Sequence, residues 1–266
     1  MLRGVSQDSR WTSKIQETLA ELDRLEERLT RLRGGFEEGS HAAVDARARN
    51  GNLAWSFAAA AVQVAFDHLR GWRHLHGSGM QPPFAHWTLL RAAVEGAVVA
   101  RWLCSPETSA QRRARGLGAQ LADFDQRQGF ESRVATAMPR VRGPRVAASQ
   151  RIDQLRTQAA ADGISGQRLP GPTSLVALHA PPAELSGESV DAEVLYRLLS
   201  AFAHGKMWAM PVLNDVVRGE KVALAPELAV TTVTAPADIV WLLTDWAVTC
   251  VRLAIADFER YSKRSG

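Results

Sequence analysis

Cysteine is scarce in this chain, with two residues among 266. Both of them, Cys104 and Cys250, lie inside apolar patterns with helical spacing. Two such thiols do not make a disulfide framework, so the fold must depend on the burial of apolar side chains. We therefore expect a protein of a reduced, cytoplasmic compartment.

Long uninterrupted apolar runs are also missing. Residues 1–10 are polar and lack the apolar run of a signal peptide. Residues 54–66 are apolar but too few to span a bilayer, and residues 239–258 carry three charged side chains. The sequence therefore predicts a soluble protein that has no membrane partner.

Several motifs of enzyme chemistry are absent from the sequence. It contains no phosphate-binding P-loop, no G-x-S-x-G nucleophile turn and no paired cysteine and histidine nucleophile set. Gly116-Leu117-Gly118 has no predicted strand before it, which excludes a dinucleotide-binding turn. The histidines between residues 68 and 86 lack the spacing of zinc ligands. We expect neither a cofactor nor a metal ion.

Lysine is rare, and the positive charge is carried almost entirely by arginine. Ten arginines and four acidic residues lie between Arg112 and Arg156. Arginine forms bidentate contacts with phosphate, so Arg140, Arg142 and Arg145 are candidate nucleic-acid-binding residues. The alternative is a solvated helix face in a chain whose codon usage favours arginine.

Apolar residues recur at spacings of three and four, which predicts an all-α bundle of about six to seven helices. Ser13-Lys14-Ile15-Gln16 is typical of a capping box at a helix start. The helix that follows is either an arm formed by residues 1–39 or one more helix packed on its own domain. Residues 40–266 are expected to form the helical bundle domain.

Caps, glycines and prolines divide the rest of the chain. Ser105-Pro106-Glu107 is typical of a helix start, and residues 163–188 are rich in glycine, proline and serine, which predicts a long loop. Valine-rich runs predict a small β-hairpin near 212–233. The helices are expected at 40–76 with a bend near Gly51, 84–103, 105–130, 144–161, from 189, and 236–261.

The most informative stretch is Tyr196-Arg197-Leu198-Leu199-Ser200-Ala201-Phe202-Ala203-His204-Gly205. The spacing places Arg197, Ser200 and His204 on one stripe of a helix, with leucines and Phe202 on the adjoining faces. Burial of such polar groups without partners costs about 1–3 kcal/mol each, so their alignment predicts a polar site.

A second apolar helix carries Arg91 and Glu95 four residues apart. Charged pairs at this spacing bind each other or join a cross-helix network, and we expect a network that includes Arg197. The alternative is a purely structural cluster, in which Arg197 pairs with Glu95 or Glu193 and His204 caps the helix end.

Tryptophans accompany both helices of this predicted polar cleft. Trp87 precedes Arg91 by four residues and Trp208 follows His204 by four. The eight tryptophans fall at apolar helical positions and are expected to be mainly core. The spacing nevertheless allows these two to border the cleft, where an indole stacks on a nucleic-acid base.

The segments 90–95 and 196–205 resemble a group of bacterial all-helical proteins whose cores are similar to the HEPN superfamily. Many members are metal-independent endoribonucleases of toxin or phage-defence systems, and others are inactive binding modules. Their signature is an arginine, four to six residues and a histidine on one helix, which Arg197 and His204 match with six intervening residues. Leu198 departs from the signature, since an asparagine, aspartate or histidine commonly follows that arginine.

The resemblance implies a helical bundle that acts on RNA or a nucleotide as a homodimer. Two arginines and two histidines then meet across the interface, His204 is the acid or base, Arg197 stabilises charge on phosphorus, and Ser200 orients His204. A protein partner such as an antitoxin is also implied. The alternatives are a catalytically inactive helical regulator and a small-molecule-binding bundle in which residues 163–187 form a lid.

Overall fold

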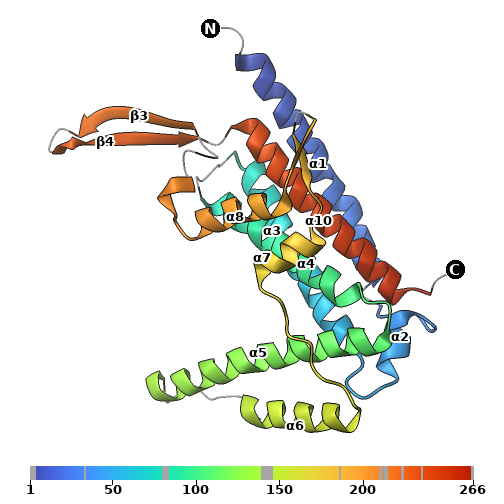
Figure 1. Cartoon of the computed structure of the whole chain (residues 1–266). Coiled ribbons are helices and arrows are strands. Elements are labelled where there is room, and N and C mark those ends of the chain that lie inside the picture. The colour runs from blue at the N-terminus through green and yellow to red at the C-terminus, as the bar shows by residue number, and fades with distance from the viewer. Residues whose placement is uncertain are drawn as a thin grey trace. The chain divides into compact units, whose positions relative to one another are not determined.

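The computed structural model describes residues 4–32, 34–79, 84–138, 146–185, 187–209, 212, 215–222, 225–234 and 236–264. Most of these residues are helical, which confirms the predicted all-α class (Figure 1). The α-helices are α1 (Gly4–Leu32), α2 (His41–Ala46), α3 (Leu53–Gly77), α4 (Ala85–Cys104), α5 (Ser109–Ala137), α6 (Ala148–Ala161), α7 (Pro172–His179), α8 (Ala192–Ala203) and α10 (Ala237–Ser262). A short 3-10 helix, η1 (Met207–Ala209), follows α8.

Two antiparallel hairpins accompany the helices. The predicted hairpin is confirmed as β3 (Asp215–Val222) and β4 (Ala225–Thr234), whose register begins with Asp215 opposite Thr234. A second hairpin, β1 (Ala183–Leu185) with β2 (Glu188–Val190), was not predicted. Helix α7 and strand β1 lie in the segment expected to be one long loop, and this expectation is wrong because Leu175, Val176 and Ala183 are buried despite the surrounding prolines. Strand β2 occupies residues 188–190, so α8 starts at Ala192 instead of 189.

The chain divides into two compact units that alternate along the sequence. Unit 1 comprises the described parts of Met1–Thr30, Val62–Val98 and Pro172–Ile255, and unit 2 those of Arg31–Ala61, Val99–Gly171 and Ala256–Gly266. Most of α1 belongs to unit 1, together with helices that come much later in the chain. Each unit has its own buried side chains.

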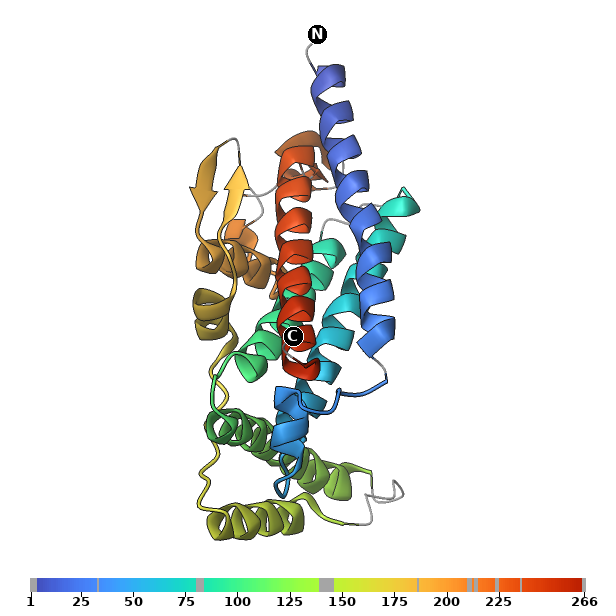
Figure 2. The ribbon, with the colours of Figure 1, turned by 90° about the vertical axis from the view of Figure 1, so that its right-hand side faces the viewer.

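In unit 1, the predicted apolar stripe of α1 is buried. Its members within this unit, Ile15, Leu19, Leu22, Leu25 and Leu29, are each at most 8 % exposed. Figures 1 and 2 show α1 beside α10, and Thr18 Oγ1 donates a hydrogen bond of 3.2 Å to Asp245 of α10. The stripe therefore packs α1 onto its own unit, which is the second of the two alternatives left open for this helix.

A hydrogen-bonded tryptophan fixes the centre of unit 1. The indole Nε1 of Trp72 donates to Thr244 Oγ1 at 3.0 Å, and that hydroxyl donates to the Val240 carbonyl at 2.7 Å. Both side chains are fully buried. The pair satisfies two polar groups inside the apolar interior, so it orients α3 against α10 at little energetic cost.

Helix α10 is long and apolar enough to cross a membrane by length and composition. Its most apolar window is 61 % buried inside the protein. Helices that pack inside a protein core have the same composition, so this composition alone is weak evidence for a membrane span.

The single helix predicted over residues 40–76 is two helices in the structure, α2 and α3. The Ser40 hydroxyl accepts a hydrogen bond from the Ala43 amide and caps α2, which begins at the next residue. The helix then ends at Ala46 and α3 starts at Leu53. Gly51 lies where a Cβ atom would come within 1.7 Å of the Asp45 carbonyl oxygen, so the chain can turn here only because this side chain is absent.

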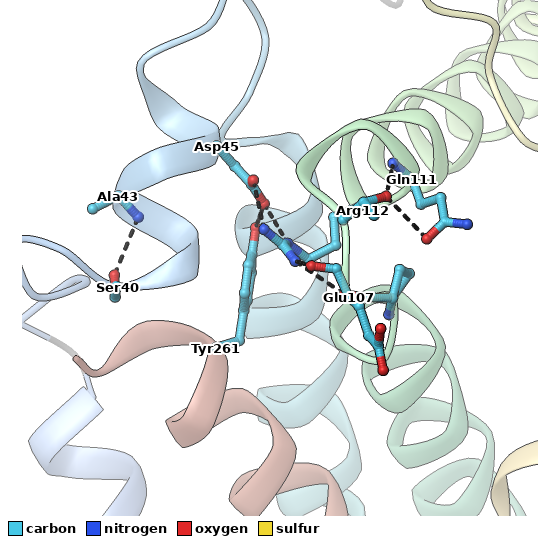
Figure 3. A network of polar contacts seen from close by, with 9 residues as sticks. Ser40, Ala43, Asp45, Glu107, Gln111, Arg112 and Tyr261 are labelled. Carbon is cyan, nitrogen blue, oxygen red and sulfur yellow. Dashed lines mark hydrogen bonds and ion pairs between the residues drawn. The ribbon is translucent and has the colours of Figure 1, made fainter. Parts of the chain in front are cut away.

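A buried ion pair lies at the centre of unit 2 (Figure 3). The Arg112 guanidinium donates to both carboxylate oxygens of Asp45, at 2.7 and 2.9 Å, and to the carbonyls of Pro106 and Glu107 at 3.0 and 2.7 Å. The hydroxyl of Tyr261 donates to the same carboxylate at 2.9 Å. The two charged side chains are 3 % and 0 % exposed, so their charges are balanced inside the protein.

This network explains why α5 starts later than the sequence suggested. The helix begins at Ser109 with Thr108 as its N-cap, whose hydroxyl accepts from the Gln111 amide, and the predicted start at Ser105 is wrong. The carbonyls of Pro106 and Glu107 bind Arg112 instead of continuing a helix. Helix α6 then packs on α5 over a small core of Leu117, Leu155 and Ala159.

Replacing Asp45 with asparagine should destabilise the protein by about 3–5 kcal/mol, because Arg112 would stay buried without a counter-charge. Urea unfolding followed by circular dichroism measures this loss. Glu21→Gln is the control, since Glu21 pairs with Arg252 at 3.5 Å on the surface. Its effect should stay within about 0.5 kcal/mol. Equal effects of the two substitutions would contradict the central role of the buried pair.

Candidate functional site

The predicted motif helix α8 is fixed at both ends by its own sequence. Asp191 caps its start, accepting hydrogen bonds from the amides of Glu193 and Val194 at 2.8 and 3.2 Å. At its end, His204 is the C-cap and Gly205 adopts φ of +63°. The Gly205 amide donates to the Phe202 carbonyl and the Lys206 amide to the Ala201 carbonyl, at 3.0 and 2.8 Å, which is a Schellman motif.

The inner face of α8 is buried against α4. Tyr196, Leu199 and Phe202 are each at most 3 % exposed. The Phe202 ring lies 5.7 Å from the ring of Trp87, which is fully buried on α4. Apolar packing thus decides which side of α8 faces inward and which side reaches solvent.

A polar cluster joins α4 and α8 through Tyr196. The Tyr196 hydroxyl donates a 2.6 Å hydrogen bond to Glu95 Oε1, and Arg91 Nη2 binds the same oxygen at 2.8 Å. The Arg91 guanidinium also lies 5.8 Å from the centre of the Tyr196 ring. Burial, followed by the hydrogen bond to Glu95, raises the pKa of Tyr196 to about 12. The cluster therefore holds a neutral phenol against a carboxylate and a guanidinium.

Arg197 takes no part in the contacts of this cluster. Its guanidinium binds Glu193, one turn earlier on α8, with N–O distances of 2.7 and 2.8 Å. The Arg197 side chain is 66 % exposed. The predicted cross-helix network thus forms through Tyr196, and the expectation that it includes Arg197 is wrong. Burial of the neighbouring tyrosine on the apolar stripe was the missed signal, because a buried phenol needs a polar partner.

Arg197, Ser200 and His204 lie on the outer side of α8. Arg197 and His204 are exposed and Ser200 is half-buried. We call these three residues the outer stripe. None of its three side chains takes part in the contacts described for the Arg91–Glu95–Tyr196 cluster, so the five predicted site residues form two groups, Arg91 with Glu95 on α4 and the outer stripe on α8. A guanidinium and an imidazole on the outer stripe are both open to a ligand or to another protein chain.

Many arginines of the basic segment have structural roles. Arg112 is buried, Arg113 binds Asp162 at 3.3 Å and Arg127 binds Glu131 at 2.6 Å. Arg115 donates to the Trp102 carbonyl and to Ser105. These contacts account for much of the local positive charge. The candidate nucleic-acid-binding residues Arg140, Arg142 and Arg145 lie outside the described residues.

A groove of about 750 Å³ runs along α3 in unit 1. Its polar lining includes Arg70, Arg73 and His74, and an adjoining apolar hollow of about 660 Å³ continues past Leu89 of α4. Both arginines already pair with acidic residues of α1. The groove is therefore mixed in charge and is not a simple anion site.

In the parts of the chain that the structure describes, no group of three or more histidine, cysteine, aspartate or glutamate side chains is arranged to hold a metal ion. The buried thiol of Cys104 has its pKa raised by burial, so it is a poor nucleophile there. The chemistry available at the outer stripe is thus that of arginine, serine and histidine.

The two tyrosines of the chain allow a direct test of the polar cluster. In a Tyr261→Phe variant, Tyr196 is the one remaining tyrosine, and its tyrosinate absorbance should titrate with a pKa of about 12. Adding Glu95→Gln should lower this pKa, because the accepting carboxylate is lost. Glu193→Gln, which removes the carboxylate that pairs with Arg197 instead of Tyr196, should leave it unchanged.

The same shift makes stability depend on pH. The folded state keeps Tyr196 neutral above the ordinary pKa of 10, so its stabilising contribution is present below pH 10 and is lost as the pH rises toward 12. A pKa near 10 in the single-tyrosine variant would show that Glu95 and burial do not act on the phenol.

Comparisons with known proteins give no independent guide to the function. No family model matches this chain, and neither a curated protein nor a solved structure matches it. A function can therefore be inferred only from the side chains of α8 and from the resemblance of the Arg197–His204 motif to the HEPN signature.

Proposed function

We propose that the protein is a metal-independent endoribonuclease that works as a homodimer through the outer stripe of α8. The observation that carries this proposal is the joint exposure of Arg197 and His204 on one side of the same helix. Their spacing matches the HEPN signature described above. A toxin or phage-defence setting, in the cytoplasm, is part of the same proposal.

The residues of the outer stripe have the chemistry that RNA cleavage without metal requires. The ribose 2′-oxygen attacks the adjacent phosphorus as its proton passes to an imidazole, and the bond from phosphorus to the 5′-oxygen breaks. A proton returns to that leaving oxygen, which gives a 2′,3′-cyclic phosphate and a 5′-hydroxyl. His204 is the proton-transfer group, and Arg197 stabilises the negative charge on the phosphoryl oxygens.

The ion pair with Glu193 does not prevent this role. Exposed pairs at this helical spacing contribute about 0.3–0.5 kcal/mol, whereas an arginine–phosphate contact with two hydrogen bonds is stronger. A bound phosphate can therefore take Arg197 from Glu193. In the absence of RNA, Glu193 holds the guanidinium close to the helix surface.

A second copy of the chain brings the two groups together. Seven residues of α-helix rise about 10 Å, so Arg197 and His204 of one chain start far apart for a single phosphate. A two-fold axis across α8 places Arg197 of each protomer near His204 of its partner. We propose that each cleavage site combines one residue from each protomer.

Two alternative functions remain. One uses the outer stripe for binding without catalysis, and the other uses a different surface of the protein. A catalytically inactive helical regulator would bind RNA or a protein through the outer stripe. A small-molecule-binding bundle is favoured by the groove along α3, where a polar and an apolar compartment adjoin. Thermal stabilisation by a small molecule that is lost in His74→Ala would support this last function.

The nuclease proposal predicts RNA cleavage by the purified protein in the presence of EDTA. His204→Ala should reduce the rate by at least about 100-fold, as expected for loss of a general acid or base. Mass spectrometry of the products should find 2′,3′-cyclic phosphate ends. Circular dichroism should show an unchanged fold, because His204 is exposed at a helix end.

His41→Ala is the matched control, since His41 is an exposed histidine at the start of α2 in unit 2. This variant should cleave RNA at the wild-type rate. Equal activity of His204→Ala and the wild type would remove His204 from the mechanism, and cleavage that stops in EDTA would contradict the metal-independent reaction.

A further inference from the structure

Trp208 differs from the other tryptophans of the chain. All eight lie in described segments; four are buried, three are partly buried and Trp208 alone is exposed, at 58 %. The three partly buried rings have aromatic partners: Trp11 and Trp241 lie 5.0 Å apart, and Trp55 contacts Phe36 and Phe258. Trp208 makes no ring or cation–π contact with any side chain in the described part of the chain, and more than half of the residue is exposed.

The backbone around Trp208 is fixed although the side chain is exposed. Trp208 is the central residue of η1, and the Ala209 amide donates to the Lys206 carbonyl at 3.1 Å. Ala209 is fully buried. The Lys206 amide closes the Schellman motif of α8 through the Ala201 carbonyl. The turn therefore anchors the chain on both sides of an indole that points to solvent.

This turn follows directly on the outer stripe. His204 is the C-cap of α8, Lys206 is exposed, and Trp208 comes four residues after the imidazole. An imidazole, an ammonium group and an indole thus share one short, well-fixed segment. These groups match a proton-transfer residue, a phosphate contact and a base-stacking surface.

We propose that Trp208 stacks on an unpaired base next to the cleaved phosphate. This inference rests on the proposed ribonuclease function and adds a base-binding residue to it. The bases of a duplex are stacked on each other and present no free face to a side chain, whereas a single strand can splay a base onto an aromatic ring. Lys206 contributes the contact to the neighbouring phosphate.

Binding of a non-cleavable probe tests the stacking role separately from catalysis. A short fluorescein-labelled 2′-O-methyl oligoadenylate lacks the attacking hydroxyl, and its affinity is measured by fluorescence anisotropy with the full-length protein. Trp208→Ala should weaken binding roughly 5- to 150-fold, the range found when one stacked base loses its aromatic partner. Binding of a blunt duplex of the same length should change little.

Two further substitutions separate stacking from simple apolar contact. Trp208→Phe keeps an aromatic face and should retain most of the affinity, whereas Trp208→Leu keeps apolar area without a π-system and should behave like Trp208→Ala. Equal binding by the leucine and phenylalanine variants would overturn the stacking role. Light scattering should find the same oligomeric state in all variants, and a dimer lost on Trp208→Ala would assign the residue to a protein interface instead.

The outcomes also distinguish this inference from the nuclease proposal. If the wild type cleaves RNA in EDTA and Trp208→Ala cleaves and binds equally well, the stacking role is wrong while the nuclease function stands. If the wild type neither binds the oligoadenylate nor cleaves RNA, the function itself fails and the stacking role fails with it.

Discussion

The packing of α8 against α4, which includes the hydrogen bond from Tyr196 to Glu95, determines which side of α8 is available for function. This hydrogen bond is short, at 2.6 Å, and it links the inner face of α8 to a carboxylate that Arg91 also binds. With Tyr196, Leu199 and Phe202 held inward, Arg197 lies on the face of the helix that reaches solvent. The outer stripe is thus a consequence of how the inner face is packed.

Each unit relies on polar groups that are satisfied inside an apolar interior. In unit 1, the Trp72 indole and the Thr244 hydroxyl bind each other and a backbone carbonyl. In unit 2, Arg112, Asp45 and Tyr261 form a network whose hydrogen bonds include two loop carbonyls. Buried groups of this kind favour one arrangement of helices, because any other arrangement leaves donors or charges unpaired.

Local sequence signals predicted much of the fold. The apolar spacing of α1, the helix start at residue 40, the end of α6 at Ala161 and the hairpin of β3 with β4 all follow from residues close together in the chain. The late start of α5 could not be predicted in this way, because Ser105 and Thr108 are both good N-caps. Which of them caps the helix depends on the hydrogen bonds from Arg112 to the carbonyls of Pro106 and Glu107. Helix α7 was missed because burial of Leu175 and Val176 outweighs the composition around them.

The candidate site was predicted in part for a similar reason. Helical spacing placed Arg197, Ser200 and His204 on one stripe, and Arg91 with Glu95 on another helix. The spacing could not decide which residue of α8 meets Glu95, since Tyr196 and Arg197 are adjacent and both bind carboxylates. The exposure of Trp208 also depends on tertiary packing, because a tryptophan near an apolar helix end is more often part of the core.

Mixing two inactive variants tests the composite dimer site most directly. Arg197→Ala protein lacks the guanidinium and His204→Ala protein lacks the imidazole, and each alone should fail to cleave RNA. Heterodimers of the two retain one site with an intact Arg197 and an intact His204 from opposite protomers, so the account predicts that subunit exchange restores cleavage. Heterodimers that form and stay inactive would contradict it.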